Sequence, residues 1–383
     1  MPTVMISCGE PSGDVYAGAL ARELRVIRPG TRIAGLGGDR LRDAGADLVG
    51  DYRGLSVTGL VEAVSVLPRA WAMKRALVAR ARRERLDALV VIDFPDFNFR
   101  LAASLHRLGV PVIYYVCPQV WAWRPGRLRV LRRLVDRALV IFPFEEPIYQ
   151  EAQIPVAFVG HPLLDLAVAS AGREALAAEW GLAADAPTVA LLPGSRPNEL
   201  HGTLPALAAA VPMIASRVPR AQFVVACAPN LDGALFDPLR RPGGPRVVLV
   251  TGRTDDVLTS ADVVVTASGT ATVQTAIHER PMVIVYRVAP LSYTLGRRFV
   301  NVDTFGMANL IAGRRIVPEL IQGGFTPGAV TAETVRYFDD PEYAVRTRAA
   351  LHEVREKLGA PGASRRAAEH VLAICDARGG RAE

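Results

Sequence analysis

The sequence predicts an α/β protein with two doubly wound parallel-sheet domains, because the same strand, turn and helix pattern opens each half of the chain. Thr3–Cys8 is a short buried-strand pattern that ends in a turn rich in Gly, Pro and Ser at 9–14. Thr188–Leu192 ends in a similar turn at 193–198, and an apolar helical pattern follows both turns. This is how a Rossmann-like domain begins, and its ligands bind beyond the carboxyl ends of the strands. Two such domains facing each other would place their turns across a shared cleft.

The length of the chain and its further strand patterns support this organisation. At 383 residues, the chain is long enough for two domains with separate cores. We expect the first domain at 1–165 and the second at 166–340, with a hinge beginning at Gly160-His161-Pro162. C-terminal helices at about 341–376 are expected to return to the first domain. Strand patterns alternate with helical ones, which predicts parallel sheets. The expected strands are Val4–Ser7, Arg32–Leu36, Ala88–Asp93, Val110–Val116, Ala138–Phe142, Val156–Val159, Thr188–Leu192, Gln222–Ala226, Arg246–Val250, Asp262–Thr266 and Met282–Tyr286.

Composition excludes several classes of protein. Hydrophobic residues make up 50% of the chain, yet no uncharged apolar stretch approaches the roughly 18 residues that span a bilayer. The N-terminus enters a strand without the regions of a secretory signal, so we expect a cytoplasmic protein. The cysteines lack the spacing of a metal site, so we expect reduced thiols, no metal and no other cofactor. They are Cys8, Cys117, Cys227 and Cys375.

Basic side chains gather in two stretches of a chain whose formal net charge is +7. One lies at 69–85 and follows the apolar stretch Leu55–Leu67, a pairing that favours an anionic membrane surface. The other lies at 124–137, after Trp121 and Trp123, which could stack on a sugar, sit at a membrane interface or pack in the core. Both stretches are also compatible with solvated helix faces. No nucleic-acid-binding signature accompanies them, so we expect no nucleic-acid partner.

Carboxylates follow the expected strand Ala88–Asp93 of the first domain. Parallel strands are apolar on both faces and ionised groups are costly to bury, so Asp93 at the strand end is a candidate catalytic base. Asp96 and Asn98 could cap the helix that follows. The turn after the first strand adds polar side chains at the same edge of the sheet, and Glu10 is the second candidate base or a ligand of a sugar hydroxyl. These side chains are Glu10, Ser12 and Asp14.

Two turns of the second domain have the character of a diphosphate site. Gly194-Ser195-Arg196 and Ser268-Gly269-Thr270 each follow a strand and open a helix. They can offer backbone N–H groups and hydroxyls to phosphate, and Arg196 matches phosphate bidentately. An ordinary turn and a plain helix cap would look the same, but together the two turns favour a nucleotide diphosphate. The sequence contains neither a P-loop nor a full dinucleotide fingerprint.

These residues carry a resemblance to the lipid A disaccharide synthase family. Seven motifs follow one another in order through essentially the whole chain. The Gly-Glu-x-Ser-Gly-Asp and Trp-Ala-Trp motifs are together highly specific to this family. The seven motifs are Gly9-Glu10-Pro11-Ser12-Gly13-Asp14, Ile92-Asp93-Phe94-Pro95-Asp96-Phe97-Asn98, Trp121-Ala122-Trp123, Gly160-His161-Pro162, Pro193-Gly194-Ser195-Arg196, Ser268-Gly269-Thr270-Ala271 and Asn309-Leu310-Ile311-Ala312-Gly313-Arg314.

The resemblance implies a GT-B glycosyltransferase that joins UDP-2,3-diacylglucosamine to 2,3-diacylglucosamine 1-phosphate (lipid X) and releases UDP. It implies an inverting, metal-independent enzyme at the cytoplasmic face of the inner membrane, and it leaves a homodimer open. The family's presumed base falls on Asp93, its diphosphate arginine on Arg196 and its nucleotide-pocket asparagine on Asn309. Arg314 closes the last motif and is a further candidate.

Two positions depart from the family pattern, and the first of them matters for nucleotide binding. Gln274 stands where the family carries a glutamate expected to hold the ribose, and an amide should do so more weakly than a carboxylate. We therefore expect Gln274→Glu to tighten UDP binding. Pro11 also replaces a small residue, which leaves the turn plausible.

Two other functions remain open from the residues. The chain could be another GT-B enzyme that uses UDP-N-acetylglucosamine, either an epimerase or a transferase of peptidoglycan synthesis. It could also be a non-catalytic nucleotide- or lipid-binding protein, although the placement of Asp93 argues against that class.

Overall fold

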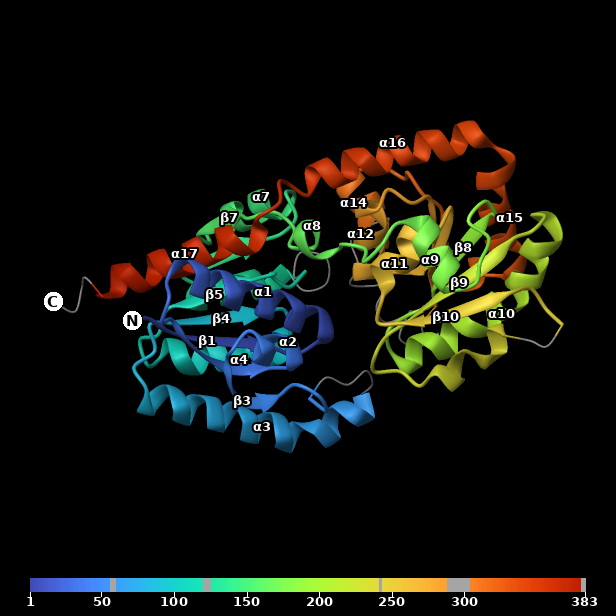
Figure 1. Cartoon of the computed structure of the whole chain (residues 1–383). Helices are drawn as coiled ribbons and strands as arrows, with labels where there is room; N and C mark the ends of the chain where they lie inside the picture. The colour runs from blue at the N-terminus through green and yellow to red at the C-terminus, as the bar shows by residue number, and fades with distance from the viewer. Residues whose placement is uncertain (56–59, 120–124, 241–242, 288–303, 380–383) are drawn as a thin grey trace. The chain divides into compact units, whose positions relative to one another are not determined.

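The computed structural model describes residues 1–55, 60–119, 125–240, 243–287 and 304–379, with backbone alone at 60–65, 125 and 379. It confirms an α/β protein with two parallel sheets, each in its own compact unit (Figure 1). The first unit comprises Met1–Leu164 and Leu358–Glu383, and the second comprises Asp165–Lys357. No described helix combines the length and apolar character needed to cross a bilayer.

The sheet of the first unit has the order β3-β2-β1-β4-β5-β6-β7, with all neighbours parallel. The order reverses between β1 and β4, where Cys8 lies beside Ile92. The crevice for a ligand in such a sheet forms at this switch point, beyond the carboxyl ends of the strands. The strands are β1 (Thr3–Cys8), β2 (Arg32–Gly37), β3 (Asp47–Asp51), β4 (Ala88–Ile92), β5 (Val112–Tyr115), β6 (Arg137–Val140) and β7 (Val156–Phe158).

The sheet of the second unit repeats the same arrangement. Its order is β10-β9-β8-β11-β12-β13, again parallel, and the order reverses between β8 and β11. The turns that follow β8 and β11 are therefore neighbours at one edge of the sheet. The strands are β8 (Thr188–Leu192), β9 (Gln222–Cys227), β10 (Val247–Thr251), β11 (Val263–Ala267), β12 (Met282–Tyr286) and β13 (Glu319–Ile321).

The helices cover the sheets with apolar faces at helical spacing. In α10, Leu200, Leu204, Leu207, Val211 and Ile214 are buried on one side. Each unit encloses its own cluster of buried side chains, as two domains require. The α-helices are α1 (Pro11–Ile27), α2 (Asp39–Asp43), α3 (Leu60–Arg83), α4 (Pro95–His106), α6 (Leu128–Leu134), α7 (Glu145–Glu151), α8 (Leu163–Leu166), α9 (Arg173–Glu179), α10 (Pro197–Arg217), α11 (Thr254–Ser260), α12 (Thr270–Ile277), α14 (Met307–Ala312), α15 (Pro327–Asp339), α16 (Pro341–Lys357) and α17 (Ala363–Gly379). Short 3₁₀ helices lie at η1 (Pro125–Arg127), η2 (Gly233–Leu239) and η3 (Gln322–Gly324).

The sequence did not predict β3 and β13. Both are edge strands with a neighbour on one side, and all their residues except the exposed Asp47 are partly buried. β3 contains two aspartates and a glycine, and β13 has three residues. An edge strand need not be apolar on both faces, so it lacks the continuous apolar run that marks the inner strands.

The two C-terminal helices belong to different units, which differs from the expectation that both return to the first domain. α16 packs on α12, α14 and α15 of the second unit, and Lys357 Nζ at its end donates to Ala312 O of α14 (3.1 Å). α17 alone returns and packs on α1, where Arg28 binds both carboxylate oxygens of Asp376 (2.5 and 2.8 Å).

Arg366 fastens the returning segment. Its guanidinium donates to Val159 O (2.9 Å), Pro361 O (2.7 Å) and Ala360 O (2.6 Å). Gly160 has φ 82°, a left-handed conformation that favours glycine, and a Cβ there would lie 2.7 Å from the guanidinium. The expected hinge residue His161 donates its N–H to Leu358 O (2.9 Å) within the same unit. The division between the units falls after Leu164 and after Lys357.

We expect Arg366→Met to lower the free energy of unfolding by about 2 kcal/mol, because hydrogen bonds to charged groups contribute roughly 1.5–3 kcal/mol each and are only partly replaced by water. The neighbouring Arg365, whose side chain is 60% exposed and paired with Glu369, is the matched control. Arg365→Met should change stability by less than about 1 kcal/mol. Urea unfolding followed by circular dichroism measures both, and equal effects would contradict the role of Arg366.

Candidate functional site

In the first unit, the turns after β1 and β4 are brought together by a close contact. The ring of Phe94 lies against Gly9, and a Cβ at position 9 would come within 2.1 Å of that ring. Phe94 also stacks on Phe97, with ring centroids 5.4 Å apart. Glycine at position 9 therefore lets the turn that carries Glu10 approach the turn that carries Asp93.

Asp93 lies at the carboxyl end of β4, as the sequence predicted, and its side chain is half-buried. Its backbone is left-handed, with φ 42°, and Phe94 follows with φ 49°. Such values are uncommon for residues other than glycine and mark a candidate functional position. Burial raises the pKa of Tyr16 and of Tyr114, and the charge of Asp93 contributes to both shifts. Both phenols therefore remain protonated around this carboxylate.

The structure gives three of the predicted polar residues internal partners. Asp96 is exposed and pairs with Arg127. Asn98 is fully buried, accepts from Ser7 Oγ (2.7 Å) and donates to backbone carbonyls at the end of β4. Neither residue is the N-cap of α4, which is Phe94. Asp14 is buried and accepts from the backbone N–H groups of 38, 40 and 41 at the start of α2. Asn98 and Asp14 thus hold backbone in place.

Of the remaining first-domain candidates, the structure describes Glu10 and Ser12 but not the two tryptophans. Glu10 is the half-buried N-cap residue of α1, and Ser12 is half-buried in the first turn of that helix. Both lie at the edge that carries Asp93. Trp121 and Trp123 lie outside the described residues.

In the second unit, a glutamate lies over the turn that follows β8. Glu199 accepts the Ser195 N–H with Oε2 (2.8 Å), and its Oε1 is 3.3 Å from Arg196 Nη1. Arg196 is the N-cap of α10, and Gly194 has φ 136°. The N–H group and the guanidinium that the sequence assigned to a diphosphate thus already attract one anion. Sequence reasoning missed Glu199, although a carboxylate three residues after an N-cap is a known capping pattern.

The turn after β11 stands beside this one. Ser268 Oγ donates to Phe305 O (2.9 Å), while Gly269 and Thr270 are exposed at the N-terminus of α12. Gly269 has φ 147°, and a Cβ there would meet no atom of the described residues within 4 Å. Among the described residues, the backbone at this helix start is therefore accessible to an anionic ligand.

Asn309 and Arg314 have internal roles that the sequence did not predict. Asn309 is buried, donates to Val317 O (2.9 Å) and Glu319 Oε1 (2.7 Å), and accepts the N–H groups of Ile316 and Val317. Its amide joins α14 to the approach to β13. Arg314 is exposed beyond the other end of α14 and pairs with Glu353 (2.8 Å).

Gln274 also contacts a carboxylate inside its own unit. Its Nε2 donates to Asp255 Oδ1 (2.7 Å), and His278 Nε2 is 2.9 Å from the same oxygen. A glutamate at 274 would bring two carboxylates into contact. The hydrogen bond to Asp255 in α11 therefore explains why an amide stands at position 274. No local pattern around 274 could reveal this partner.

His161 is a buried residue to which sequence reasoning assigned no site role. It follows β7 at the carboxyl edge of the sheet, with the rings of Tyr16 and Phe142 at 6.2 and 5.3 Å between centroids. Burial lowers the pKa of His161 to about 3, so it is neutral, and its Nδ1 accepts the Leu163 N–H (3.2 Å). Its position in a Gly-His-Pro run directly after a strand was the sequence signal that could have placed it at this edge of the sheet.

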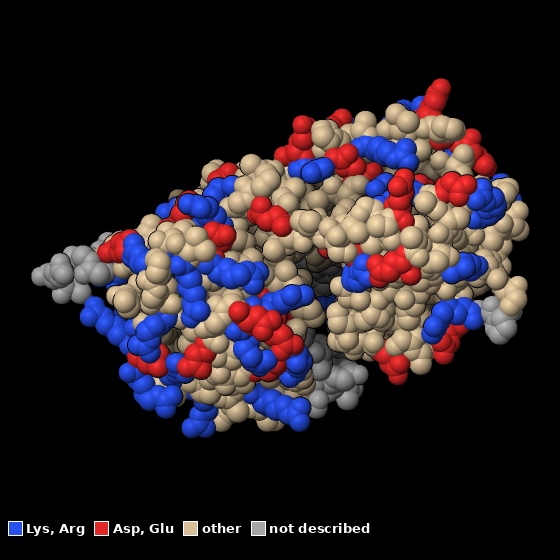
Figure 2. All heavy atoms as spheres, viewed as in Figure 1, with Lys and Arg blue, Asp and Glu red and all other residues tan. Residues whose placement is uncertain are grey.

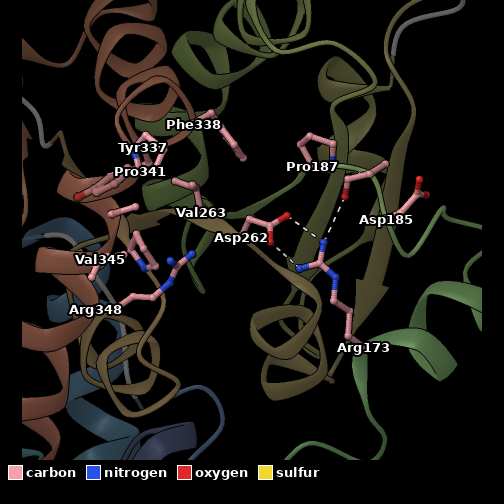
Figure 3. A pocket seen from close by; sticks show the side chains of 13 residues that line it. Arg173, Asp185, Pro187, Asp262, Val263, Tyr337, Phe338, Pro341, Val345 and Arg348 are labelled. Atoms are coloured by element: carbon pink, nitrogen blue, oxygen red, sulfur yellow. Dashed lines mark hydrogen bonds and ion pairs between the residues drawn. The ribbon is translucent and has the colours of Figure 1, made fainter.

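A cavity of about 370 Å³ lies at the opposite edge of the second sheet (Figure 3). Its wall includes Pro187, Asp262 and Pro281, which precede β8, β11 and β12. Arg173 crosses this edge and binds both carboxylate oxygens of Asp262 (2.5 and 2.9 Å). Ligands of open parallel sheets bind at the carboxyl ends, so we place the candidate site at the other edge. The described residues include no group of three or more His, Cys, Asp or Glu able to hold a metal ion.

Comparison with known proteins gives one family. The family model described as lipid-A-disaccharide synthetase matches residues 4–374. The lipid-A-disaccharide synthase of Geobacter sulfurreducens is 42% identical over 372 residues, which is 96% of each chain. That of Anaeromyxobacter dehalogenans is 42% identical over 375 residues, or 97% of each chain.

Solved structures share the fold at lower identity. UDP-GlcNAc 2-epimerase from Neisseria meningitidis bound to UDP-GlcNAc has a TM-score of 0.69 at 12% identity, covering 97% of this chain and 100% of that one. The glycotransferase of kitacinnamycin has a TM-score of 0.66 at 20% identity, covering 97% and 98%. These likenesses establish the fold alone, which is that of GT-B glycosyltransferases and epimerases.

We expect Gln274→Glu to destabilise the second unit and not to tighten UDP binding, which reverses the expectation from sequence. The variant loses the hydrogen bond to Asp255 and sets two like charges in contact, at a cost of about 1–3 kcal/mol. Acidification towards pH 4 should restore part of the stability, because one carboxyl then protonates and becomes a donor.

Thermal unfolding and calorimetric titration with UDP measure these effects. Asp255→Asn combined with Gln274→Glu is the control, because it restores one amide and one carboxylate. If the double variant is as unstable as the single one, repulsion from Asp255 is not the cause.

Proposed function

This chain belongs to the lipid-A-disaccharide synthase family, and from that premise we propose its reaction. It transfers 2,3-diacylglucosamine from UDP-2,3-diacylglucosamine to the 6-hydroxyl of 2,3-diacylglucosamine 1-phosphate (lipid X), with inversion and release of UDP. The observation that carries the proposal is a family match that spans residues 4–374, and so includes both sheets.

Asp93 is the proposed base. Inversion needs one group that takes the proton from the acceptor hydroxyl as it attacks the anomeric carbon. Asp93 stands at the switch point of the first sheet with a left-handed backbone, and residues other than glycine in this conformation cluster at functional sites. Glu10, on the adjacent turn, is the second candidate for the same role.

The second unit is proposed to hold UDP. The departing diphosphate gains negative charge in the transition state, so a group that contacts it more strongly there speeds the reaction. Arg196, the Ser195 N–H and the exposed start of α12 at Gly269 and Thr270 are suited to this. The Glu199 carboxylate contacts both Arg196 and the Ser195 N–H in this structure. A bound diphosphate would therefore replace Glu199 at these two groups.

An anionic membrane surface is the proposed source of the acylated substrates. Leu67 (50% exposed) and Trp71 (59% exposed) lie one turn apart on α3, and the Arg75 guanidinium lies 4.6 Å from the centre of the Trp71 ring. Basic side chains line the part of the first unit formed by α3 (Figure 2). Leu55, which the sequence placed in the membrane-facing stretch, is buried in the core instead.

The cellular location and the oligomeric state of the protein are also proposals. We propose that the enzyme works at the cytoplasmic face of the inner membrane, because its proposed substrates carry fatty chains, and the homodimer remains a prediction. The structural likeness to UDP-N-acetylglucosamine epimerases concerns the fold alone. Incubation with unacylated UDP-N-acetylglucosamine distinguishes that alternative, because an epimerase would convert it without lipid X.

Mass spectrometry after incubation with lipid X and its UDP derivative should detect the disaccharide 1-phosphate and UDP. Asp93→Asn should keep the fold and UDP affinity, yet lose turnover by a factor on the order of 10² or more, because it removes a base at constant size. Near-normal turnover would move the role to Glu10 or Asp96. Absence of the disaccharide with the unaltered chain would contradict the proposed reaction.

Binding to vesicles should rise with anionic lipid content and fall with salt, because each basic side chain near the surface contributes about 1 kcal/mol. Arg75→Glu with Arg82→Glu should release the protein from vesicles, while turnover of detergent-dispersed substrate stays nearly intact. Arg346→Glu, on an exposed side chain of α16, is the matched control and should leave sedimentation unchanged. Sedimentation that ignores both salt and the α3 charges would identify this face as an ordinary solvated helix.

A further inference from the structure

The backbone around Asp93 is strained at adjacent strand ends. Asp93 and Phe94 are left-handed after β4, and Val116, directly after β5, has φ 56°. Left-handed backbone is a genuine outlier for a β-branched residue such as valine. The two strand ends are coupled, because Asp93 N–H donates to Val116 O (3.2 Å). Strain persists only where surrounding contacts over-determine the conformation.

The contacts that over-determine Asp93 converge on its carbonyl oxygen. Asn98 Nδ2 donates to it (2.8 Å) from α4, and Tyr114 Oη donates to it (2.8 Å) from β5. A carbonyl oxygen has two lone pairs, and these two donors match them. Both donor side chains are fully buried, so the two donors themselves are shielded from water.

Asn98 is itself held from the neighbouring strand. Its Oδ1 accepts from Ser7 Oγ (2.7 Å), and its Nδ2 also lies within reach of Ser7 O (3.3 Å) and Ile92 O (3.2 Å). Ser7 belongs to β1 and Ile92 to β4, so the amide bridges the switch point of the sheet. Hydrogen bonds through Asn98 and Tyr114 therefore tie the Asp93 carbonyl to three strands, β1, β4 and β5.

We propose that Tyr114 and Asn98 are positioning residues that hold Asp93 in its left-handed conformation and thereby orient its carboxylate for proton transfer. The inference rests on the proposed role of Asp93 as the base. Neither residue touches the carboxylate through these bonds. With the Asp93 N–H and carbonyl both fixed, the direction of its Cα–Cβ bond is fixed too, and the side chain starts from one point in one direction.

Loss of one donor should lower the share of molecules with a competent Asp93. An unbound left-handed residue relaxes toward ordinary backbone conformations, and turnover falls with the population of the competent state. The Asp93 carbonyl is bonded to Asn98 and Tyr114, so the proposal gives it no contact with substrate. The effect should therefore appear in kcat and leave both KM values and the UDP dissociation constant unchanged.

Tyr114→Phe is the test, because it removes the hydroxyl and keeps the ring. We expect kcat to fall about fivefold, the size of one net hydrogen bond. Tyr337→Phe is the matched control: Tyr337 is also buried, and its hydroxyl donates to the carbonyl of Met282 (3.1 Å) at the start of β12, in the other unit. Both variants should lose similar stability, and only Tyr114→Phe should lose kcat.

A double-mutant cycle separates positioning from general packing. If Tyr114 acts through Asp93, then Tyr114→Phe should have no further effect on the residual turnover of Asp93→Asn. An additional fivefold loss in that background, a change confined to KM, or an unchanged kcat in Tyr114→Phe would each overturn the inference. Failure of the proposed base is seen separately, as normal turnover of Asp93→Asn alone.

Discussion

The arrangement of the candidate site depends on one constraint, the reversal of strand order in each parallel sheet. Between β1 and β4, and again between β8 and β11, neighbouring strands send their following helices to opposite faces. The carboxyl ends of such a strand pair are left uncovered. Residues about 85 positions apart in the first unit thus share one edge, and the turns that carry Arg196 and Ser268 share another. Side chains far apart in sequence meet only because of this topology.

Buried or half-buried carboxylates then stabilise the backbone around those edges. Asp14 binds the start of α2, Glu199 the turn before α10, and Glu319 the N–H groups of Phe305 and Gly306 before α14. Each places negative charge where unsatisfied N–H groups and the helix dipole favour it. The same physical preference on which the proposed diphosphate site rests thus also shapes the loops beside that site. Glu199 contacts groups that belong both to this loop stabilisation and to the proposed diphosphate site.

The fold leaves the chemistry undecided. The epimerase and the glycotransferase share this architecture at 12% and 20% identity, so the two sheets by themselves do not select a reaction. What distinguishes this chain lies in the turns, where Asp93 follows β4 in a strained conformation and Arg196 precedes α10. A rigid sheet that fixes such turns allows a single carboxylate to be placed accurately, because hydrogen-bonded strands resist displacement.

The sequence by itself determined the fold class, the inner strands and the turns that follow them, because continuous apolar runs and Gly/Pro turns are local signals. It also singled out Asp93 as a candidate base, since a carboxylate after a buried strand is conspicuous, and that role stays a prediction. Only the tertiary structure showed that three polar side chains are buried and hold backbone in place, namely Asn98, Asp14 and Asn309. It also showed that Arg314 forms a surface ion pair with Glu353 and that Gln274 donates a hydrogen bond to Asp255. The physical reason is that a polar side chain acts through its partner. The partners of Asp14, Gln274 and Arg314, and the Ser7 hydroxyl that binds Asn98, lie between 19 and 91 positions away, where no local pattern reports them.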